Sequence, residues 1–311
     1  MSLGVLNNIN AVYAENNLNN TSNSLSKVLN QLSSGSKINS GADDAAGLSL
    51  VNGLSANSAA LTQSTTNATE GVGLLQVADG ALSQVTSLLN RAVTLATEAS
   101  NGTLNTSQTD AANQEYQSIL SEISNIGSTT TYNGNAVFTG TNVDIDTGDS
   151  TSTGASIDSL YFATLSNSTV GDAGGAVSLT AAAGTSPATI TYTPKASATN
   201  QIDLSATSLT GATTAAAQTA AQATLTALNS AITDVAAQDG YVGAQINTLN
   251  SVSSVLSTQQ ENVVSAQNAV QATDYASATS NMSKYEILSQ TGISALAQAN
   301  SVQQEVSKLL Q

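Results

Sequence analysis

Apolar residues recur at intervals of seven through two long segments of the chain, and these rows predict a pair of long helices. The first segment contains the row Leu54, Leu61, Ala68, Leu75, Leu82, Leu89 and Ala96, beside a second row, Leu74, Ala81, Leu88 and Leu95. The second segment contains the row Leu228, Val235, Val242, Leu249, Leu256, Val263 and Val270. Uninterrupted heptad rows indicate helices that pack lengthwise on other helices, so we predict that these rows form the core of a helical rod. An ordinary antiparallel bundle within one domain is the simpler alternative.

The two ends of the chain carry similar rows with few charges around them. The first 40 residues contain Leu18, Leu25 and Leu32 seven apart, with Val28 and Leu29 between them. The last 24 contain Leu288, Ala295, Val302 and Leu309, accompanied by Leu296, Val306 and Leu310. An apolar row without a thick core nearby needs a partner to cover it. We therefore expect the ends to pack on each other and on neighbouring copies of the chain.

The middle of the chain has a different composition and a different pattern of apolar residues, which predict short strands. Both prolines, Pro187 and Pro194, fall between residues 141 and 211, where Gly, Ser, Thr and Asp are dense. Apolar and polar residues alternate in Val143–Asp146, Ile190–Tyr192 and Ile202–Leu204, as in half-exposed strands.

The segment before this region predicts a helix and a hairpin. A polar break at residues 100–109 precedes a second helical pattern, in which Tyr116, Ile119, Leu120, Ile123 and Ile126 are spaced at threes and fours. Asn133-Gly134 then indicates a tight hairpin turn. The predicted fold is mainly α, with paired N- and C-terminal helices in a coiled-coil-like rod, a β-hairpin and a small β-rich domain inserted in the middle.

The domain boundaries follow from these changes of pattern. We expect terminal helices at 1–43 and 272–311, the helical rod with its hairpin at 44–165 and 212–271, and an exposed insertion at 166–211. Helix resumes after Thr213, in an Ala-rich run. If the N- and C-terminal helical blocks are to cover each other's apolar rows, they must lie side by side.

Composition argues against catalysis. The chain contains neither Cys nor His, so thiolate nucleophiles, imidazole bases and zinc sites of the ordinary ligand type are excluded. Asp43 and Asp44 are adjacent and precede a helical pattern, which favours a helix cap over a catalytic pair of carboxylates. We expect a protein that is not an enzyme and that uses no cofactor and no metal.

Charge and hydropathy narrow the choice of partners. The net charge is −15 and the six basic residues are scattered, so nucleic acid and anionic membrane surfaces are unsuitable partners. The first basic residue is Lys27, so no positively charged segment of a cleavable signal is visible. No apolar run approaches the roughly 20 residues of a membrane helix. We expect a cytoplasmic protein or one exported without a cleaved signal.

Several short motifs, in order, resemble bacterial flagellins. At the N-terminal side they are Asn16–Asn19, Leu32–Ser40, Asp43–Gly47, Ala99–Thr103 and Tyr132–Gly134. At the C-terminal side they are Ala272–Ala276, Ser280–Lys284, Ile287–Leu288 and Leu296–Asn300. The resemblance covers about the first 140 and the last 95 residues, and the middle resembles no family.

The resemblance implies a structural subunit that self-assembles into the extracellular flagellar filament for swimming. It implies that the chain ends line an inner tube, that they are disordered in the monomer, and that the middle faces solvent. The implied partners are further copies of the chain, a flagellar export chaperone, and filament cap and hook-junction proteins. A hook–filament junction protein is the alternative. A flagellin that carries a metalloprotease would need His, and a signalling rod would need a membrane span or a ligand domain.

The resemblance also marks a surface patch. Arg91, Leu95 and Glu115 correspond to family positions that animal innate receptors contact. The family pattern Gln-Arg-Val-Arg-Glu-Leu is replaced here by Asn90-Arg91-Ala92-Val93-Thr94-Leu95, which lacks one Arg and one Glu. A solvated helix face is the alternative explanation for Arg91.

Overall fold

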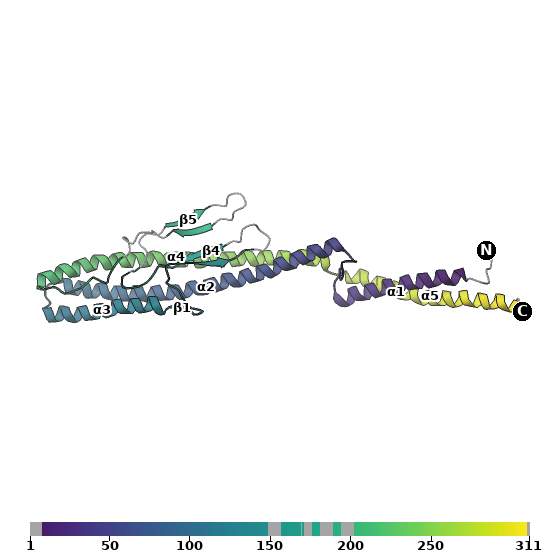
Figure 1. Ribbon diagram of the computed structural model, residues 1–311, viewed down its shortest axis with the longest axis horizontal. Helices are drawn as coiled ribbons and strands as arrows, with labels where there is room; N and C mark the ends of the chain where they lie inside the picture. Colours follow the sequence, from purple (N-terminus) through teal and green to yellow (C-terminus); the bar gives the residue numbers. More distant parts are fainter. Residues whose placement is uncertain are drawn as a thin grey trace. The chain divides into compact units, whose positions relative to one another are not determined.

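The computed structural model describes residues 8–148, 157–168, 170, 176–180, 189–193 and 202–309 (Figure 1). Its helices are α1 (Ile9–Ser34), α2 (Ala45–Ser100), α3 (Thr106–Thr129), α4 (Thr214–Gln271) and α5 (Tyr275–Leu309). Its strands are β1 (Thr131–Tyr132), β2 (Asn135–Ala136), β3 (Asn142–Asp146), β4 (Ile157–Tyr161), β5 (Ala176–Thr180) and β6 (Thr189–Thr193). The predicted fold, mainly α with small β elements in the middle, is confirmed.

The chain divides into two compact units. One, here called the terminal unit, comprises Met1–Ala56 and Asn262–Gln311, and the other, the central unit, comprises Asn57–Glu261. Helices α2 and α4 each contribute residues to both units. The helices themselves are interrupted elsewhere, at residues 35–44 and 272–274.

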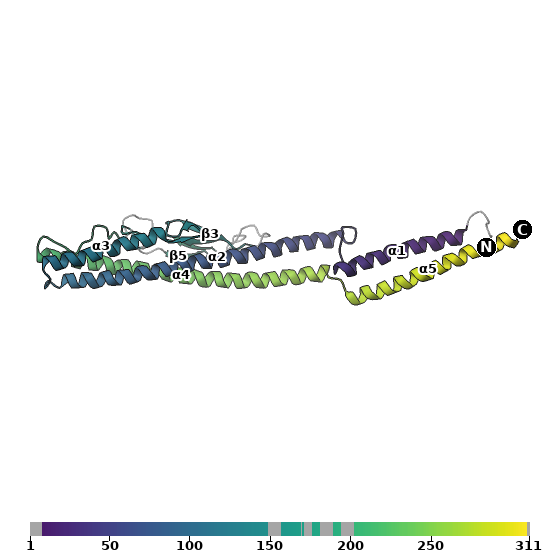
Figure 2. The ribbon, with the colours of Figure 1, turned by 90° about the horizontal axis from the view of Figure 1, so that it is seen from below.

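The core of the central unit lies between α2 and α4, which run antiparallel (Figure 2). The amide of Gln218 donates to the carbonyl of Ser100 at one end, and the amide of Gln260 donates to the hydroxyl of Thr62 at the other. Between these contacts the heptad rows are buried, at Leu61, Ala68, Leu75, Leu82, Leu89 and Ala96 in α2 and at Leu228, Val235, Val242, Leu249 and Leu256 in α4. The rows place apolar groups on one face of each helix, and packing those faces together removes them from water.

Helix α3 adds a third layer to this core. Asn105 and Gln108 form a capping box, in which each side chain accepts a hydrogen bond from the other's backbone amide. Tyr116, Ile119, Leu120 and Ile123 are buried in the same core cluster as the seam of α2 and α4. The helix therefore begins at a cap that the sequence encodes and is held by its apolar face.

The predicted hairpin is present directly after α3. Strands β1 and β2 pair antiparallel, with Tyr132 opposite Asn135. Asn133 has φ 49° and Gly134 has φ 80°, the left-handed conformations that a type I′ turn requires. The Asn-Gly sequence therefore fixes the turn, because these two residue types adopt positive φ with the least strain.

The part of the β region that the structure describes contains two further antiparallel pairs. Strand β3 pairs with β4, and β5 pairs with β6. The strand expected at Ile202–Leu204 is wrong, because Ile202 makes only an isolated bridge to Val170. The side chain of Asp203 accepts hydrogen bonds from the amide and hydroxyl of Ser205, and this local turn ends the extended segment.

Helix α2 corrects the expectation that no apolar segment approaches the length of a membrane helix. Among the described residues it is the single helix long and apolar enough to cross a membrane, as judged by length and composition alone. The core helix of a bundle passes the same test. The heptad row of α2 is buried against α4 and α3, which accounts for its apolar composition.

Candidate assembly surface

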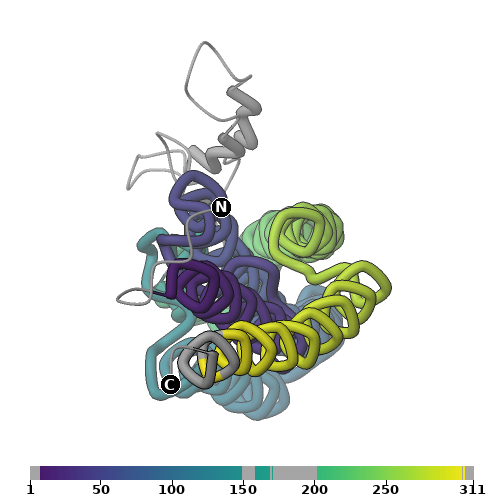
Figure 3. The backbone as a smooth tube through the Cα atoms, turned by 90° about the vertical axis from the view of Figure 1, so that its right-hand side faces the viewer, coloured from purple at the N-terminus to yellow at the C-terminus, as the bar shows by residue number. Residues whose placement is uncertain are grey.

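The candidate functional site is the pair of terminal helices, which lie side by side in the terminal unit (Figure 3). The Asn8 side chain caps α1 by accepting from the amide of Ala11, and its amide group donates to the carbonyl of Ala299 in α5 at 3.0 Å. Farther along, Gly292 leaves room for Leu18, whose Cδ1 would lie 3.3 Å from a Cβ at that position. A small residue here lets the two backbones approach closely.

The helix pair buries few of its apolar side chains. Within the described part of the terminal unit, the buried apolar residues are Val28, Ile38, Val51 and Ala278. Nearly all the exposed large apolar side chains of the described residues belong to this unit, and Val77 and Val255 are the exceptions. Those in the terminal unit are Ile9, Val12, Tyr13, Leu29, Leu50, Val264, Tyr275, Ile287, Leu288, Ile293 and Val302. A surface with this much exposed apolar area marks an interaction site.

The residues that the sequence suggested for assembly take three kinds of position. Leu18, Leu25, Leu32 and Leu296 are half-buried between or beside the helices, and Leu29, Leu288 and Val302 are exposed. Val306 and Leu309 lie in α5, but their side chains are outside the described part, and Leu310 lies outside the described residues. In the rod rows, Leu54 and Val263 fall in the terminal unit and are half-buried.

Sequence reasoning missed the most exposed apolar groups on these helices. Tyr13 is 66% exposed, Ile9 and Ile287 are each 62% exposed, and Ile293 is 56% exposed. Ile9, Val12 and Tyr13 have the spacing of three and four that marks one face of a helix, so the signal was available. These positions fall outside the rows of seven that run along the two helices.

Two backbone hydrogen bonds join the segment that follows α1 to the segment between α4 and α5. Gly35 follows α1 with φ 69°, a left-handed conformation that ends the helix. The amide of Lys37 donates to the carbonyl of Gln271 at 2.7 Å, and the amide of Thr273 donates to the carbonyl of Gly35 at 3.1 Å. A Cβ at Gly35 would lie 2.9 Å from the Tyr275 hydroxyl, so glycine suits this position for two reasons.

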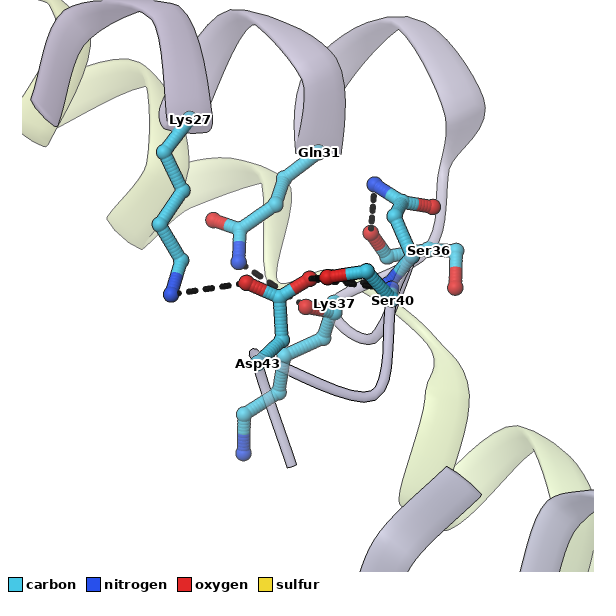
Figure 4. Close-up of polar contacts among 7 residues, drawn as sticks. Lys27, Gln31, Ser36, Lys37, Ser40 and Asp43 are labelled. Atoms are coloured by element: carbon cyan, nitrogen blue, oxygen red, sulfur yellow. Dashed lines mark hydrogen bonds and ion pairs between the residues drawn. The ribbon is translucent and has the colours of Figure 1, made fainter. Parts of the chain in front are cut away.

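The adjacent acids Asp43 and Asp44 have separate structural tasks, and Figure 4 shows the contacts of Asp43. Asp44 caps α2, because its carboxylate accepts from the amide of Gly47 at 2.9 Å. Asp43 instead binds Lys27 of α1, with 2.8 Å between Nζ and Oδ1. Its other oxygen accepts from the amides of Asn39 and Ser40 and from the Ser40 hydroxyl. The cap predicted for this pair is therefore found at Asp44, and Asp43 ties the loop back onto α1.

The environment of Asp43 stabilises its charged form. The hydrogen bond from Lys27, followed by those from Ser40 and Asn39, lowers the pKa of Asp43 from 3.8 to about 2. A lowered folded-state pKa means that the stabilisation is present above the unfolded value of 3.8 and is lost as the pH falls toward 2. The contact between Asp43 and Lys27 should therefore persist at neutral and mildly acidic pH.

We predict that Lys27→Met raises the pKa of Asp43 toward 3.8, because it removes the largest cause of the shift. Carbon-13 NMR of the Asp43 carboxyl group through an acid titration measures this pKa. Lys37→Met is the matched control, since the ion pair of Asp43 is with Lys27. Equal titration midpoints in the two variants would contradict the assigned ion pair.

The three residues of the suggested receptor patch do not share one surface. Arg91 and Glu115 form an exposed ion pair between α2 and α3, with 2.7 Å between Nη2 and Oε1. Leu95 is only 3% exposed and belongs to the core. In this structure the side chains available to a partner at this place are those of Arg91 and Glu115.

Comparisons with known proteins agree with this architecture. The family model for the bacterial flagellin N-terminal helical region matches residues 5–143, and that for the bacterial flagellin C-terminal helical region matches residues 225–310. The flagellin of Listeria monocytogenes is 30% identical over 97% of this chain and 98% of its own length. The comparisons give no support to the alternative of a hook–filament junction protein.

Two further comparisons cover less of the molecule. Polar flagellin C of Vibrio parahaemolyticus is 38% identical over 45% of this chain, and the match spans 36% of its own length. The crystal structure of Bacillus cereus flagellin is 22% identical, covers 65% of this chain and 94% of its own, and has a TM-score of 0.42. The two family models and the nearly full-length Listeria relative show that the chain belongs to the bacterial flagellin family, which is a family of structural proteins.

Proposed function

We propose that this chain is the structural subunit that self-assembles into the flagellar filament and so serves swimming motility. The observation that carries the proposal is the exposed apolar surface of α1 and α5. Ile9, Tyr13, Ile287 and Ile293 are each more than half exposed in a single copy. Removing such side chains from water is worth roughly 1.5–3 kcal/mol each when they become fully buried. Neighbouring copies are the occupants that membership of a filament family favours.

The contact between copies is expected to be of the open kind. A face of one copy that binds a different face of the next gives a helical polymer when the rotation does not close a ring. The charges in this part of the chain are few: after Gln271 the charged residues are Asp274, Lys284, Glu286, Glu305 and Lys308. Apolar groups can therefore approach one another with little repulsion between copies.

The domains receive roles by the same reasoning. Residues 1–43 and 272–311 would line the inner tube of the filament, 44–165 and 212–271 would form the layer outside it, and 166–211 would face solvent. The polymer would be extracellular, after export of the chain without a cleaved signal. A flagellar export chaperone would cover the apolar C-terminal helix before export, and cap and hook-junction proteins would contact the ends of the polymer. Arg91 and Glu115 would remain available to a receptor in the monomer.

Assembly of the purified chain tests the proposal. Raising the protein concentration in salt should give sedimentable polymer that appears as long filaments in electron microscopy. A truncated chain without residues 272–311 should remain soluble, since it lacks half of the helix pair. The proposal fails if the full-length chain stays monomeric under every condition in which its helical circular dichroism signal is intact.

A further inference from the structure

The seam between α2 and α4 is flanked by a mostly apolar row that contains one pair of carboxylates, Asp79 and Asp239. Besides the contacts at its two ends, a Cβ at Gly71 would lie 3.0 Å from Leu249 Cδ1, which fixes the antiparallel register in the middle. The positions four residues after each buried heptad residue flank the seam. In this register the α2 residues Val72, Asp79, Thr86 and Val93 lie opposite the α4 residues Ile246, Asp239, Ile232 and Leu225.

The other members of this flanking row complete the hydrophobic core. The five apolar residues among them, Val72, Val93, Leu225, Ile232 and Ile246, are partly buried and pack against the core cluster. Asp79 and Asp239 take the places where a further apolar contact would fit. One oxygen of Asp239, Oδ1, is buried and has no hydrogen-bond partner, whereas Asp79 is exposed. Two carboxylates cannot donate to each other, so this contact is unsatisfied while both are ionised.

The charged groups near this pair do not neutralise it. On α2 the neighbouring charges are Glu70 and Arg91, and Arg91 is paired with Glu115. On α4, Asp234 precedes the heptad residue Val235 and so lies on the other flank of the seam. From the β region, the Asp158 carboxylate acts on Tyr241 of α4. Among the described residues, Asp79 is therefore the charged group that acts on Asp239, and it has the same sign.

We propose that Asp79 and Asp239 form a proton-operated lock in the seam between α2 and α4. With one proton between them, the carboxyl group of one residue donates a hydrogen bond to the carboxylate of the other across the seam. With no proton they repel each other and weaken the helix pair. The proposal rests on the fold of the central unit and does not depend on the proposed function.

The direction of the pH dependence follows from the surroundings. Burial, and then the neighbouring Asp79, raise the pKa of Asp239 above its ordinary value. A carboxyl group whose folded-state pKa is raised contributes stability at low pH, and this contribution is lost as the pH rises through the folded-state pKa. The central unit should therefore be more stable in mild acid than at neutral pH with respect to this pair.

Thermal unfolding of the full-length monomer between about pH 4 and pH 8 tests the lock. At neutral pH, Asp79→Asn or Asp239→Asn should raise the melting temperature by about 2–4 °C, because the amide donates the hydrogen bond that the carboxylate lacks. The gain should disappear in acid, where the natural pair carries its own proton. The double variant should gain no more than the better single variant, since the two positions share one interaction. Glu70→Gln, an exposed change of the same chemistry on α2, is the matched control.

Four results would overturn the lock. Both Asn variants could have the melting temperature of the natural chain at neutral pH. Their gain in melting temperature could also be the same at every pH, which would show an effect of packing and not of protonation. Millimolar Mg²⁺ or Ca²⁺ could raise the melting temperature of the natural chain and not of the variants, which would make the pair a cation site. Carbon-13 NMR of the Asp239 carboxyl group gives a readout that needs no variant, and an ordinary titration midpoint would also contradict the lock.

Discussion

Ile287→Glu should abolish polymerisation and leave the melting temperature of the monomer unchanged. Ile287 is 62% exposed on α5, so a charge at this position meets water in a single copy. In the proposed polymer the same charge would be buried against a neighbouring copy, at a cost of several kcal/mol. A cost of that size raises the concentration needed for assembly by roughly a hundred-fold or more. Sedimentation beside a thermal melt measures both quantities.

The control for this substitution is Gln290→Glu, which adds the same charge to an exposed position of the same helix. If both variants failed to assemble, the added charge would be responsible and the apolar surface would not. If Ile287→Glu assembled as well as the natural chain, the exposed face of α5 would not be the contact between copies. Val302→Glu, at a 40% exposed position of the terminal row, extends the same test along the helix.

Leu82→Ala, unlike Ile287→Glu, should lower the melting temperature of the monomer. Leu82 is 0% exposed and lies in the middle of the α2 heptad row. Truncation of a buried leucine costs about 2–5 kcal/mol, and in a domain of this size each kcal/mol lowers the melting temperature by about 2–4 °C. The loss should therefore amount to roughly 4–20 °C in the helical circular dichroism signal.

Val77→Ala is the matched control, because Val77 lies on the same helix and is 37% exposed. A substitution at a surface position of this kind should change stability by about 0.5 kcal/mol or less. Equal melting of the two variants would mean that the seam of α2 and α4 does not stabilise the central unit. Together, the Ile287 and Leu82 variants separate assembly from the folding of the single chain.

The helices were predictable from sequence because their packing imposes a period. A residue such as Leu75 or Leu249 must recur every seven positions to stay in the seam, so the row itself reveals the helix and its buried face. The Asn133-Gly134 turn was predictable for a similar reason, since few residue types adopt positive φ. The strand expected at Ile202–Leu204 failed because three alternating residues cannot report the competing turn at Asp203.

The contacts that depend on how helices meet were not predictable. Asp43 and Asp44 are neighbours in sequence, yet the Lys27 partner of Asp43 is visible only once the loop folds back on α1. Asp79 and Asp239 likewise look like ordinary solvated acids until the register of α2 against α4 places them opposite each other. On the terminal helices, the rows of seven include half-buried residues such as Leu18 and Leu25, and they leave out the outward-facing Ile9, Ile287 and Ile293.

In the proposed filament, copies of this chain cover the apolar face of α1 and α5. The natural chain contains no Cys, so the thiol introduced by Ile293→Cys can be followed alone in monomer and in polymer. Ala206→Cys, at an exposed position of the 166–211 region, provides the comparison. A maleimide should label both thiols quickly in the monomer, and in the polymer the thiol at position 293 should become protected while that at 206 stays reactive. Equal labelling at position 293 in monomer and polymer would mean that copies of the chain do not cover this face.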